Sequence, residues 1–418
     1  MKTRLAAVIG VLLLVAVGSV TLRPASVPAA AAGSPTGAAS AYLVAQLVNG
    51  DHLTNSFGVD YGLTADLAIA LAASDDQDPA LAKVVGYLAA HVADYADPAG
   101  TGQFPGPYSG AVGKLALVAE ITGQDPHDFG GFDLLKTLTD HVCGAADSAG
   151  SCTAAGDFYQ SFSAISQALA VLALARGGVT PPASTITRLG QLQCADGGFS
   201  ASLLGPTDTC GSDVDATGYA LQALSLVAGT SSALASGRGF LLAAQQPNGG
   251  FNGTAGENSN STGLATQGLL VTGTGSQPEV TAATTFLLGL QNNDGGFAVN
   301  AGTPGSDVRS STQALPAVAG VNLAPVSDQV SLPAPSSTPT PTPTASTSHS
   351  NRPSPSVTAS AAGTPSTGDG SQVLPAGTGD LAATGPRTGR PLLAGVLLIL
   401  AGCAALGLAR RSRPARRQ

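Results

Sequence analysis

The sequence contains no tryptophan, and aromatic residues make up only 4% of its 418 residues. Basic residues are also scarce away from the ends. Residues 33–385 hold all 26 acidic residues but only 8 of the 18 basic ones, so this stretch carries a net charge of −18 (8 minus 26). Such an acidic surface argues against nucleic acid and anionic lipid as partners, and it favours solubility in an exposed compartment.

The spacing of a metal site is absent as well. No Cys-x-x-Cys pair occurs, and the histidines stand in no ligand spacing with the cysteines. Four of the five cysteines form two close pairs, Cys143 with Cys152 and Cys194 with Cys210. In an exported protein such pairs predict disulfides, and we expect neither a metal nor a cofactor.

Both ends of the chain have the composition of targeting segments. Residues 1–32 begin with Lys2 and Arg4, continue through an apolar run and end in small residues, which predicts a secretory signal peptide. Residues 391–409 are apolar, long enough to cross a bilayer, and are followed by five arginines. We therefore expect an exported protein whose precursor is held in the membrane by a C-terminal span.

A short motif stands directly before that span: Leu381, Ala382, Ala383, Thr384 and Gly385. Motif, span and basic tail (381–418) together resemble a sortase sorting signal of the LAxTG type used by high-GC Gram-positive bacteria. The resemblance implies that sortase cuts after Thr384 and joins it to cell-wall peptidoglycan. Ala382 stands where the commoner motif has proline, which leaves the class of sortase open, and an ordinary membrane anchor is the alternative.

Residues 326–380 are dominated by proline, serine, threonine, glycine and alanine. A segment with so few large apolar residues cannot bury a core, so it predicts a disordered stalk between the folded part and the anchor.

Three copies of one pattern lie in the folded part, at 193–199, 245–251 and 291–297. The residues that recur are Gln193, Asp196, Gly197, Gly198 and Phe199; Gln245, Gly249, Gly250 and Phe251; and Gln291, Asp294, Gly295, Gly296 and Phe297. Weaker echoes place a marker phenylalanine at Phe57, Phe104 and Phe158. The chain therefore has six units of roughly 50 residues, within the usual range for repeats.

Each unit has a helical stretch, a glycine-rich turn and a second helical stretch rich in alanine, and no sustained alternating pattern predicts strands. We predict an all-α fold over residues 38–325, an (α/α)6 toroid of six helical hairpins. The second helices would form the inner ring. We expect a monomer.

These turns, each followed by an alanine-rich helix, resemble the prenyltransferase and squalene oxidase repeats of the terpenoid cyclase and protein prenyltransferase superfamily of α/α toroids, which also contains cobalamin carriers. The resemblance implies that the turn glutamine and aromatic residue tie each outer helix to the next inner helix. It is weaker in the first three units.

The sharpest catalytic candidates are Asp213 and Asp215. They resemble part of the DxDD motif of class II terpene cyclases, in which the middle aspartate protonates an alkene. Ala216 replaces the last aspartate here, and a cyclase needs many aromatic rings to stabilise carbocations. The zinc and the basic diphosphate pocket of a protein prenyltransferase have no counterpart in this sequence. We therefore interpret Asp213 and Asp215 mainly as N-terminal caps of an inner helix.

Parallel inner helices would bring their N-termini together at one mouth of the ring. The polar and aromatic residues expected to bind a ligand there are Tyr61, Tyr108, Tyr159, Gln160, Tyr219, Gln267 and Arg309. The favoured hypothesis is a non-catalytic, surface-displayed binding module for a small molecule, such as a cobalamin- or isoprenoid-like one, or for a macromolecule. The alternative is an exported enzyme, either a degenerate cyclase or a carbohydrate-active toroid that uses Asp66, Asp157, Asp213 or Asp215 as acid and base.

Overall fold

The computed structural model describes residues 33–74, 77–97, 106–254 and 256–332. The predicted signal peptide, the sorting signal and nearly all of the predicted stalk lie outside these ranges. Within them, no helix is long and apolar enough to cross a membrane.

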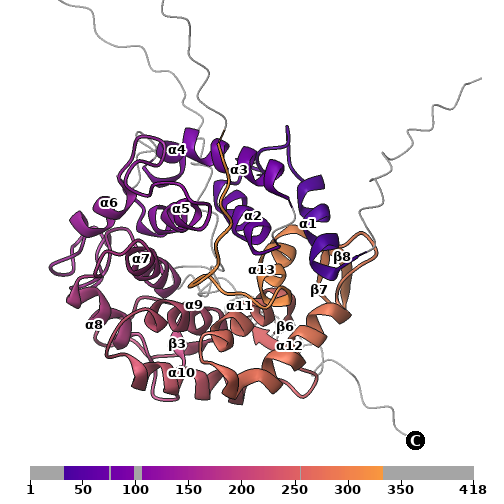
Figure 1. Cartoon of the computed structure of the whole chain (residues 1–418). Coiled ribbons are helices and arrows are strands. Elements are labelled where there is room, and N and C mark those ends of the chain that lie inside the picture. The colour runs from indigo at the N-terminus through magenta and orange to yellow at the C-terminus, as the bar shows by residue number, and fades with distance from the viewer. Residues whose placement is uncertain (1–32, 75–76, 98–105, 255, 333–418) are drawn as a thin grey trace, which may run out of the picture.

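The inner helices form a closed ring, as Figure 1 shows. In chain order they are α2 (Tyr61–Ser74), α5 (Ser109–Ile121), α7 (Ala164–Arg176), α9 (Val214–Ser225), α11 (Ser259–Leu270) and α13 (Val308–Val318). Each packs against the next, and α13 packs against α2. The predicted toroid is therefore the fold of the described residues, with the second helix of each unit inside.

The outer helices cover this ring. They are α1 (Pro35–Ala45), α3 (Asp78–Ala90) with the short α4 (Val92–Ala96), α6 (Leu134–Asp140), α8 (Ala183–Gln191), α10 (Ser231–Ala244) and α12 (Gln277–Gly289), which the 3-10 turn η1 (Thr274–Ser276) precedes. Together with the inner helix that follows it along the chain, each outer helix makes one unit, so α1 and α2 are unit 1 and α12 and α13 are unit 6.

Small residues let the inner helices approach closely. A Cβ added to Gly218 of α9 would lie 2.4 Å from the carbonyl oxygen of Leu264 in α11, and one on Gly263 would lie 2.3 Å from that of Gln313 in α13. Adjacent inner helices therefore touch backbone to backbone, in parallel and nearly in register. This is why their sequences are rich in alanine and glycine.

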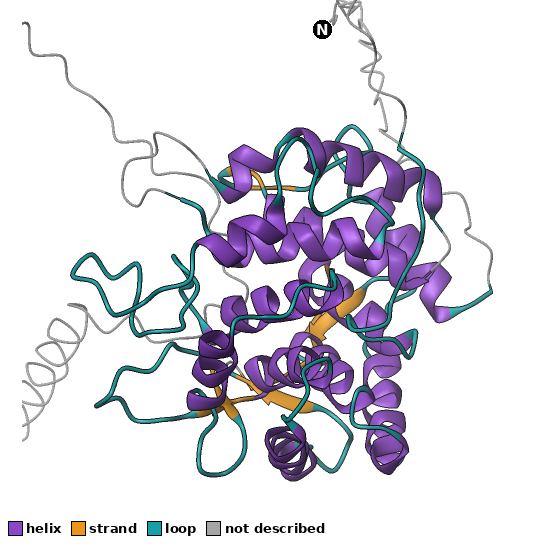
Figure 2. Cartoon of the chain, turned by 60° about the vertical axis from the view of Figure 1, so that its left-hand side comes forward, coloured by secondary structure: helices purple, strands orange, loops and turns teal. Residues whose placement is uncertain are grey.

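Four short antiparallel ribbons correct the expectation of an all-helical fold (Figure 2). They pair β1 (Thr54–Asn55) with β2 (Gly58–Val59), β3 (Phe199–Ser200) with β4 (Ser212–Asp213), β5 (Phe251–Gly253) with β6 (Gly256–Asn258), and β7 (Phe297–Asn300) with β8 (Thr303–Asp307). Strands of this length are too short to produce an alternating pattern. Three of the ribbons, β3–β4, β5–β6 and β7–β8, pair the turn phenylalanine with the cap residue of the next inner helix.

One hydrogen bond recurs where these turns meet the inner helices. The backbone N–H of Phe251 donates to the hydroxyl of Thr262 at 2.9 Å, and that hydroxyl donates to the carbonyl of the helix cap, Asn258, at 2.7 Å. Phe199 bonds Thr217 at 2.8 Å in the same way, and Phe297 bonds Ser311 at 2.9 Å.

The glutamines make a different connection from the one that the resemblance implied. Gln245 donates to Gly249 O at 3.0 Å and to Glu279 O in the next outer helix at 2.9 Å. Gln291 bonds Pro35 O of α1 at 2.7 Å, although the two are far apart in the chain. The phenylalanine thus ties the turn to the inner helix, and the glutamine ties it to the next outer helix and closes the ring.

Phe57 is not the marker of unit 1. Its side chain is 81% exposed at the tip of the first ribbon. The equivalent residue is Leu53, which is buried and donates its N–H to the hydroxyl of Thr64 at 3.0 Å. Phe158 fills the position in unit 3 and bonds Gln167. Phe104 lies outside the described residues.

Both predicted disulfides are present, Cys143–Cys152 and Cys194–Cys210. Beyond α13, the chain crosses the far end of the ring, where the inner helices finish (orange in Figure 1). Arg176 donates to the carbonyls of Leu323, Ala324 and Val326, and Asp328 N donates to Ile121 O at 2.8 Å. The stalk was expected to start at 326, but the chain stays hydrogen-bonded to the ring as far as Val330.

Candidate functional site

Side-chain caps mark the mouth of the ring, where the inner helices begin. Each cap accepts a hydrogen bond from a backbone N–H of the first helical turn. The caps with such a bond are Asp60 in unit 1, Ser163 in unit 3, Asp213 in unit 4, Asn258 in unit 5 and Asp307 in unit 6. The capping role predicted for Asp213 is therefore confirmed, with 2.8 Å from its Oδ1 to Ala216 N.

Asp215 is not a cap. Its side chain is 4% exposed, and its Oδ1 is buried with no hydrogen-bond partner among the described residues. The pKa of this carboxyl is raised to about 7, chiefly by burial and also by the charge of Asp213, while a hydrogen bond with Ser261 opposes the rise. Burial also raises the pKa of Asp213. The sequence pattern did not reveal this because the side chain turns toward α11 and away from its own helix start.

A buried ion pair lies inside the ring, below the mouth. Lys114 Nζ lies 2.6 Å from Asp66 Oδ1, and the two side chains are 1% and 7% exposed. Burial lowers the pKa of Lys114, and Asp66 opposes that change. Burial and the nearby Asp66 together raise the pKa of Tyr219 well above its ordinary value. Lys114 thus pairs with Asp66. A glycosidase needs two carboxyl groups that can act on the substrate, and a carboxylate paired with a buried lysine is poorly suited to that role.

Among the described residues, a small cavity of about 20 Å³ lies inside the ring, walled by Asp66, Tyr219 and Gln267. Leu323 of the C-terminal segment also lines it. A space of this size holds about one water molecule. In this part of the ring, side chains of the described residues therefore fill most of the lumen.

The predicted ligand residues do not form one pocket. Tyr219 and Gln267 line the axial cavity, and Arg309 is half-buried near the start of α13. Gln160 is buried beside the first disulfide and donates to Ser151 Oγ at 3.0 Å. Tyr61, Tyr108 and Tyr159 are half-buried at the mouth of units 1, 2 and 3.

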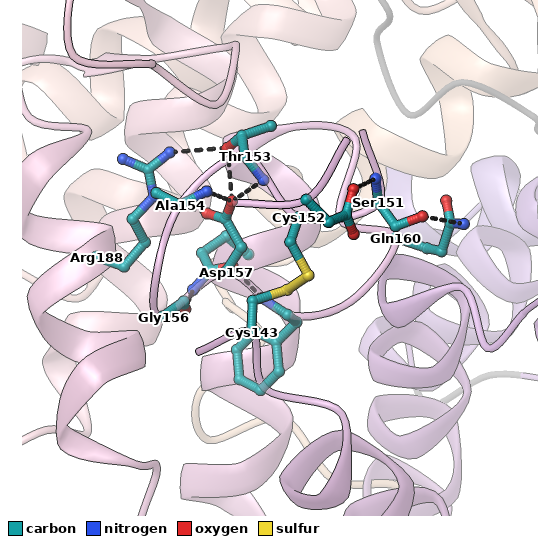
Figure 3. Close-up of a disulfide and its surroundings, with 12 residues drawn as sticks. Cys143, Ser151, Cys152, Thr153, Ala154, Gly156, Asp157, Gln160 and Arg188 are labelled. Carbon is teal, nitrogen blue, oxygen red and sulfur yellow. Dashed lines mark hydrogen bonds and ion pairs between the residues drawn. A yellow bond between two sulfur atoms is a disulfide. The ribbon is translucent and has the colours of Figure 1, made fainter. Parts of the chain in front are cut away.

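Asp157 has a structural role, which Figure 3 shows. The carboxylate is fully buried and accepts bonds from Thr153 N and Ala154 N at 2.8 Å each, and from Arg188 Nε at 2.6 Å. Both of its oxygens are occupied in holding the loop of the Cys143–Cys152 disulfide. Asp157 therefore stabilises the fold and is not available as an acid or base.

Partly exposed aromatic rings gather at the mouth, and the sequence predicted only some of them. They include the three predicted tyrosines and, in addition, Tyr87, His91 and Phe162. Tyr108 lies 5.9 Å from Phe162, measured between ring centroids. We call these six residues the aromatic rim, and all of them belong to units 1–3. Within the described ranges, no three His, Cys, Asp or Glu side chains come together as metal ligands do.

No family model and no curated protein matches the sequence. Solved structures do. A protein from Actinoplanes is 15% identical, with a TM-score of 0.53 over 68% of this chain and 98% of that one. A variant of the type II terpene cyclase MstE from Scytonema, in complex with geranylgeranyl dihydroxybenzoate, is 12% identical, with a TM-score of 0.50 over 70% of this chain and 97% of that one. At such identities these similarities establish the fold of the described residues as the α/α toroid.

Proposed function

We propose that the chain is exported, is joined to the cell wall through Thr384, and displays the toroid as a non-catalytic binding domain. The order of signal peptide, sorting motif, span and arginines supports export and anchoring, and the two disulfides are consistent with an oxidising compartment. The observation that carries the binding role is the contrast between a filled lumen and an aromatic rim at the mouth.

The filled lumen is what separates this proposal from an enzyme. Enclosed sites for small molecules usually measure about 300–1,000 Å³, whereas the axial cavity measures about 20 Å³. A polyprenyl chain or a cobalamin-like molecule would have to displace Tyr219, Gln267 and the Lys114–Asp66 pair. The ligand surface is therefore the open mouth face, where aromatic side chains provide contact area at a small cost in conformational entropy.

A second candidate function, a degenerate cyclase-like enzyme, rests on Asp215. A buried carboxyl with a pKa of about 7 and an unpartnered oxygen has the properties of a general acid. The cavity of about 20 Å³ among the described residues is too small to hold a large substrate beside this acid. The binding role therefore takes precedence.

Cell fractionation tests the anchoring. Wild type should be released from the cell surface only by wall-degrading enzymes, and Thr384→Ala should leave it in the membrane fraction. An uncut wild-type chain that keeps its arginine tail in the membrane would rule out sorting.

A thermal-shift screen of the full-length chain in detergent tests the binding role. It would use amines, saccharides, isoprenoids and corrinoids, each with wild type and with Tyr108→Leu and Tyr159→Leu variants. We expect to find a ligand that raises the melting temperature of wild type, raises it less in the two rim variants, and is recovered chemically unchanged. A ligand that is chemically converted, or one that ignores the rim, would contradict the proposal.

A further inference from the structure

Five rings form one contiguous cluster between the start of α2 and the end of α3. The ring of Tyr87 lies between those of His52 and His91, with centroids 4.5 Å and 4.3 Å away. Tyr61 lies 5.9 Å from His91 and 6.1 Å from Tyr95. We call these five residues the ring cluster. In a chain with seven tyrosines and five histidines, this gathers three of the former and two of the latter.

The cluster has a carboxylate at its exposed edge. Oδ2 of Asp94 lies 2.7 Å from His91 Nδ1, and the hydroxyl of Tyr61 donates to it at 3.5 Å. The Asp94 side chain is nevertheless 58% exposed. Both bonds fall on Oδ2 and hold the carboxylate in place. Within the described ranges no bond to Oδ1 is found, so this oxygen is available to a donor from outside.

The carboxylate at this edge has a histidine as its partner. In the described ranges, the one ion pair of Asp94 is with His91, and no lysine or arginine pairs with it. The nearby Lys83 is at the other end of the cluster, beside the turn at Gly50. Since residues 33–385 carry a net charge of −18, the surroundings attract cations over a longer range as well.

A carboxylate beside aromatic rings is a favourable environment for a cation that also donates hydrogen bonds. The face of a tyrosine ring attracts positive charge, most strongly where water is partly excluded. A carboxylate adds a charge-assisted hydrogen bond. A neutral sugar would contact the rings and accept or donate hydrogen bonds at the carboxylate, but it would gain nothing from the negative charge of Asp94.

We propose that Tyr61, with the rest of the ring cluster, and Asp94 bind an alkylammonium group, either that of a free amine or that of a lysine side chain on a partner protein. The ammonium donates to Asp94 Oδ1, and its methylene groups lie against Tyr61. This inference rests on the proposed binding role and gives it a ligand class.

The test is a titration of the full-length chain in detergent with N-acetyl-lysine methylamide, followed by tyrosine fluorescence. The chain has no tryptophan to mask this signal. The uncharged N-acetyl-norleucine methylamide is the matched control ligand, and n-butylammonium carries the same charge without a peptide. We expect saturable binding of both cations and much weaker binding of the norleucine compound. Tighter binding of the lysine compound than of butylammonium assigns the ligand to a protein, and equal binding assigns it to free amines.

Variants locate the site. Tyr61→Leu should weaken binding by about two- to thirtyfold, the range of a cation–π contact, and Asp94→Asn should weaken it at least as much. Tyr61→Phe keeps the ring but loses the bond to Asp94, so it should weaken binding less than Tyr61→Leu does. Asp208→Asn, at an exposed aspartate in the loop before α9, is the matched control and should bind like wild type. Equal affinity for the norleucine compound, or binding unchanged in both Tyr61→Leu and Asp94→Asn, overturns the inference.

Titrations with different ligands also distinguish a failure of this inference from a failure of the proposed binding role. If an N-acetylglucosamine oligomer binds the rim and the cations do not, the ammonium inference fails and the binding role survives. If the lysine compound binds but is chemically converted by the protein, the non-catalytic role fails instead.

Discussion

The two halves of the ring use their aromatic residues differently. In units 4–6 the rings are part of the fold. Phe199, Phe251 and Phe297 are fully buried in the turns. The second glycine of each turn packs under another ring, because a Cβ on it would meet Phe240, Phe286 or Tyr42 at 2.8–2.9 Å. In units 1–3 Phe129 and Phe158 are buried too, but other aromatic side chains reach the surface, and Phe57 and Phe162 are 81% and 51% exposed.

This difference separates what holds the ring closed from what meets a ligand. The three regular turns repeat one set of bonds, and the last of them joins unit 6 to α1. The irregular units depart from that set and carry both the aromatic rim and the ring cluster. In unit 3, a buried ion pair and a disulfide take the place of the regular turn. The repeats are therefore best preserved where their role is structural.

The largest expected effect is in the irregular half, at Asp157. Asp157→Ala would leave the buried Arg188 without its partner, which typically costs about 3–5 kcal/mol of unfolding free energy. Urea unfolding of the protein with both disulfides intact measures this loss of unfolding free energy. Asp147→Ala removes one hydrogen bond from the same loop and should cost less than about 1.5 kcal/mol. Equal losses in the Asp157→Ala and Asp147→Ala variants would mean that the Arg188–Asp157 ion pair does not stabilise unit 3 in place of the regular turn.

The regular half should be most sensitive at Gly295. Its φ is +92°, and an added Cβ would lie 2.1 Å from the carbonyl oxygen of Ala38 in α1. Gly295→Ala should therefore destabilise the ring by about 3–4 kcal/mol, through backbone strain and displacement of α1. Gly256→Ala is the control, with a φ of +94° and nothing near its Cβ. It should cost about 1 kcal/mol, and a similar loss at both sites would contradict closure by this turn.

The sequence predicted the ring and the inner and outer helices because those rest on local repeats. It also predicted both disulfides and the cap at Asp213. It did not predict that Leu53 takes the place of Phe57, since any large apolar side chain fills that position. The environment of Asp215 depends on Ser261 in the next unit, and the ring cluster joins residues from His52 to Tyr95. Contacts between units leave no local pattern.

The third effect depends on pH and concerns Asp215. Its folded-state pKa of about 7 lies above the ordinary value of 3.8. Between these values the unfolded chain loses the proton first, so the stability of the folded state should fall as pH rises from about 4 to about 7. Asp215→Asn should remove that fall and be more stable than wild type at pH 8, by on the order of 4 kcal/mol.

Unfolding midpoints at pH 4 and pH 8 for wild type and Asp215→Asn measure this effect. The two proteins should be alike at pH 4. A variant that is less stable than wild type at pH 8 would show that the ionised carboxylate is favourable where it lies.

A smaller effect should distinguish the turns within the regular half. Thr262→Val removes the hydroxyl that accepts the buried N–H of Phe251, and it should cost about 1–2 kcal/mol by thermal or urea unfolding. Thr285→Val, on the exposed side of α12, should cost less than about 0.5 kcal/mol. Unit 2 has Val112 at the position that matches Thr262, so a neutral result would mean that this bond is dispensable in the regular half too.

Turnover of a polyprenyl substrate tests most directly whether function resides at the rim or in the lumen. The purified chain and its Asp215→Asn variant would be incubated with geranylgeranyl compounds at pH 5–8, and the products separated by mass. We predict that both proteins return the substrate unchanged, because an axial cavity of about 20 Å³ cannot admit it. Cyclised product from wild type that is lost in the Asn variant would contradict the account.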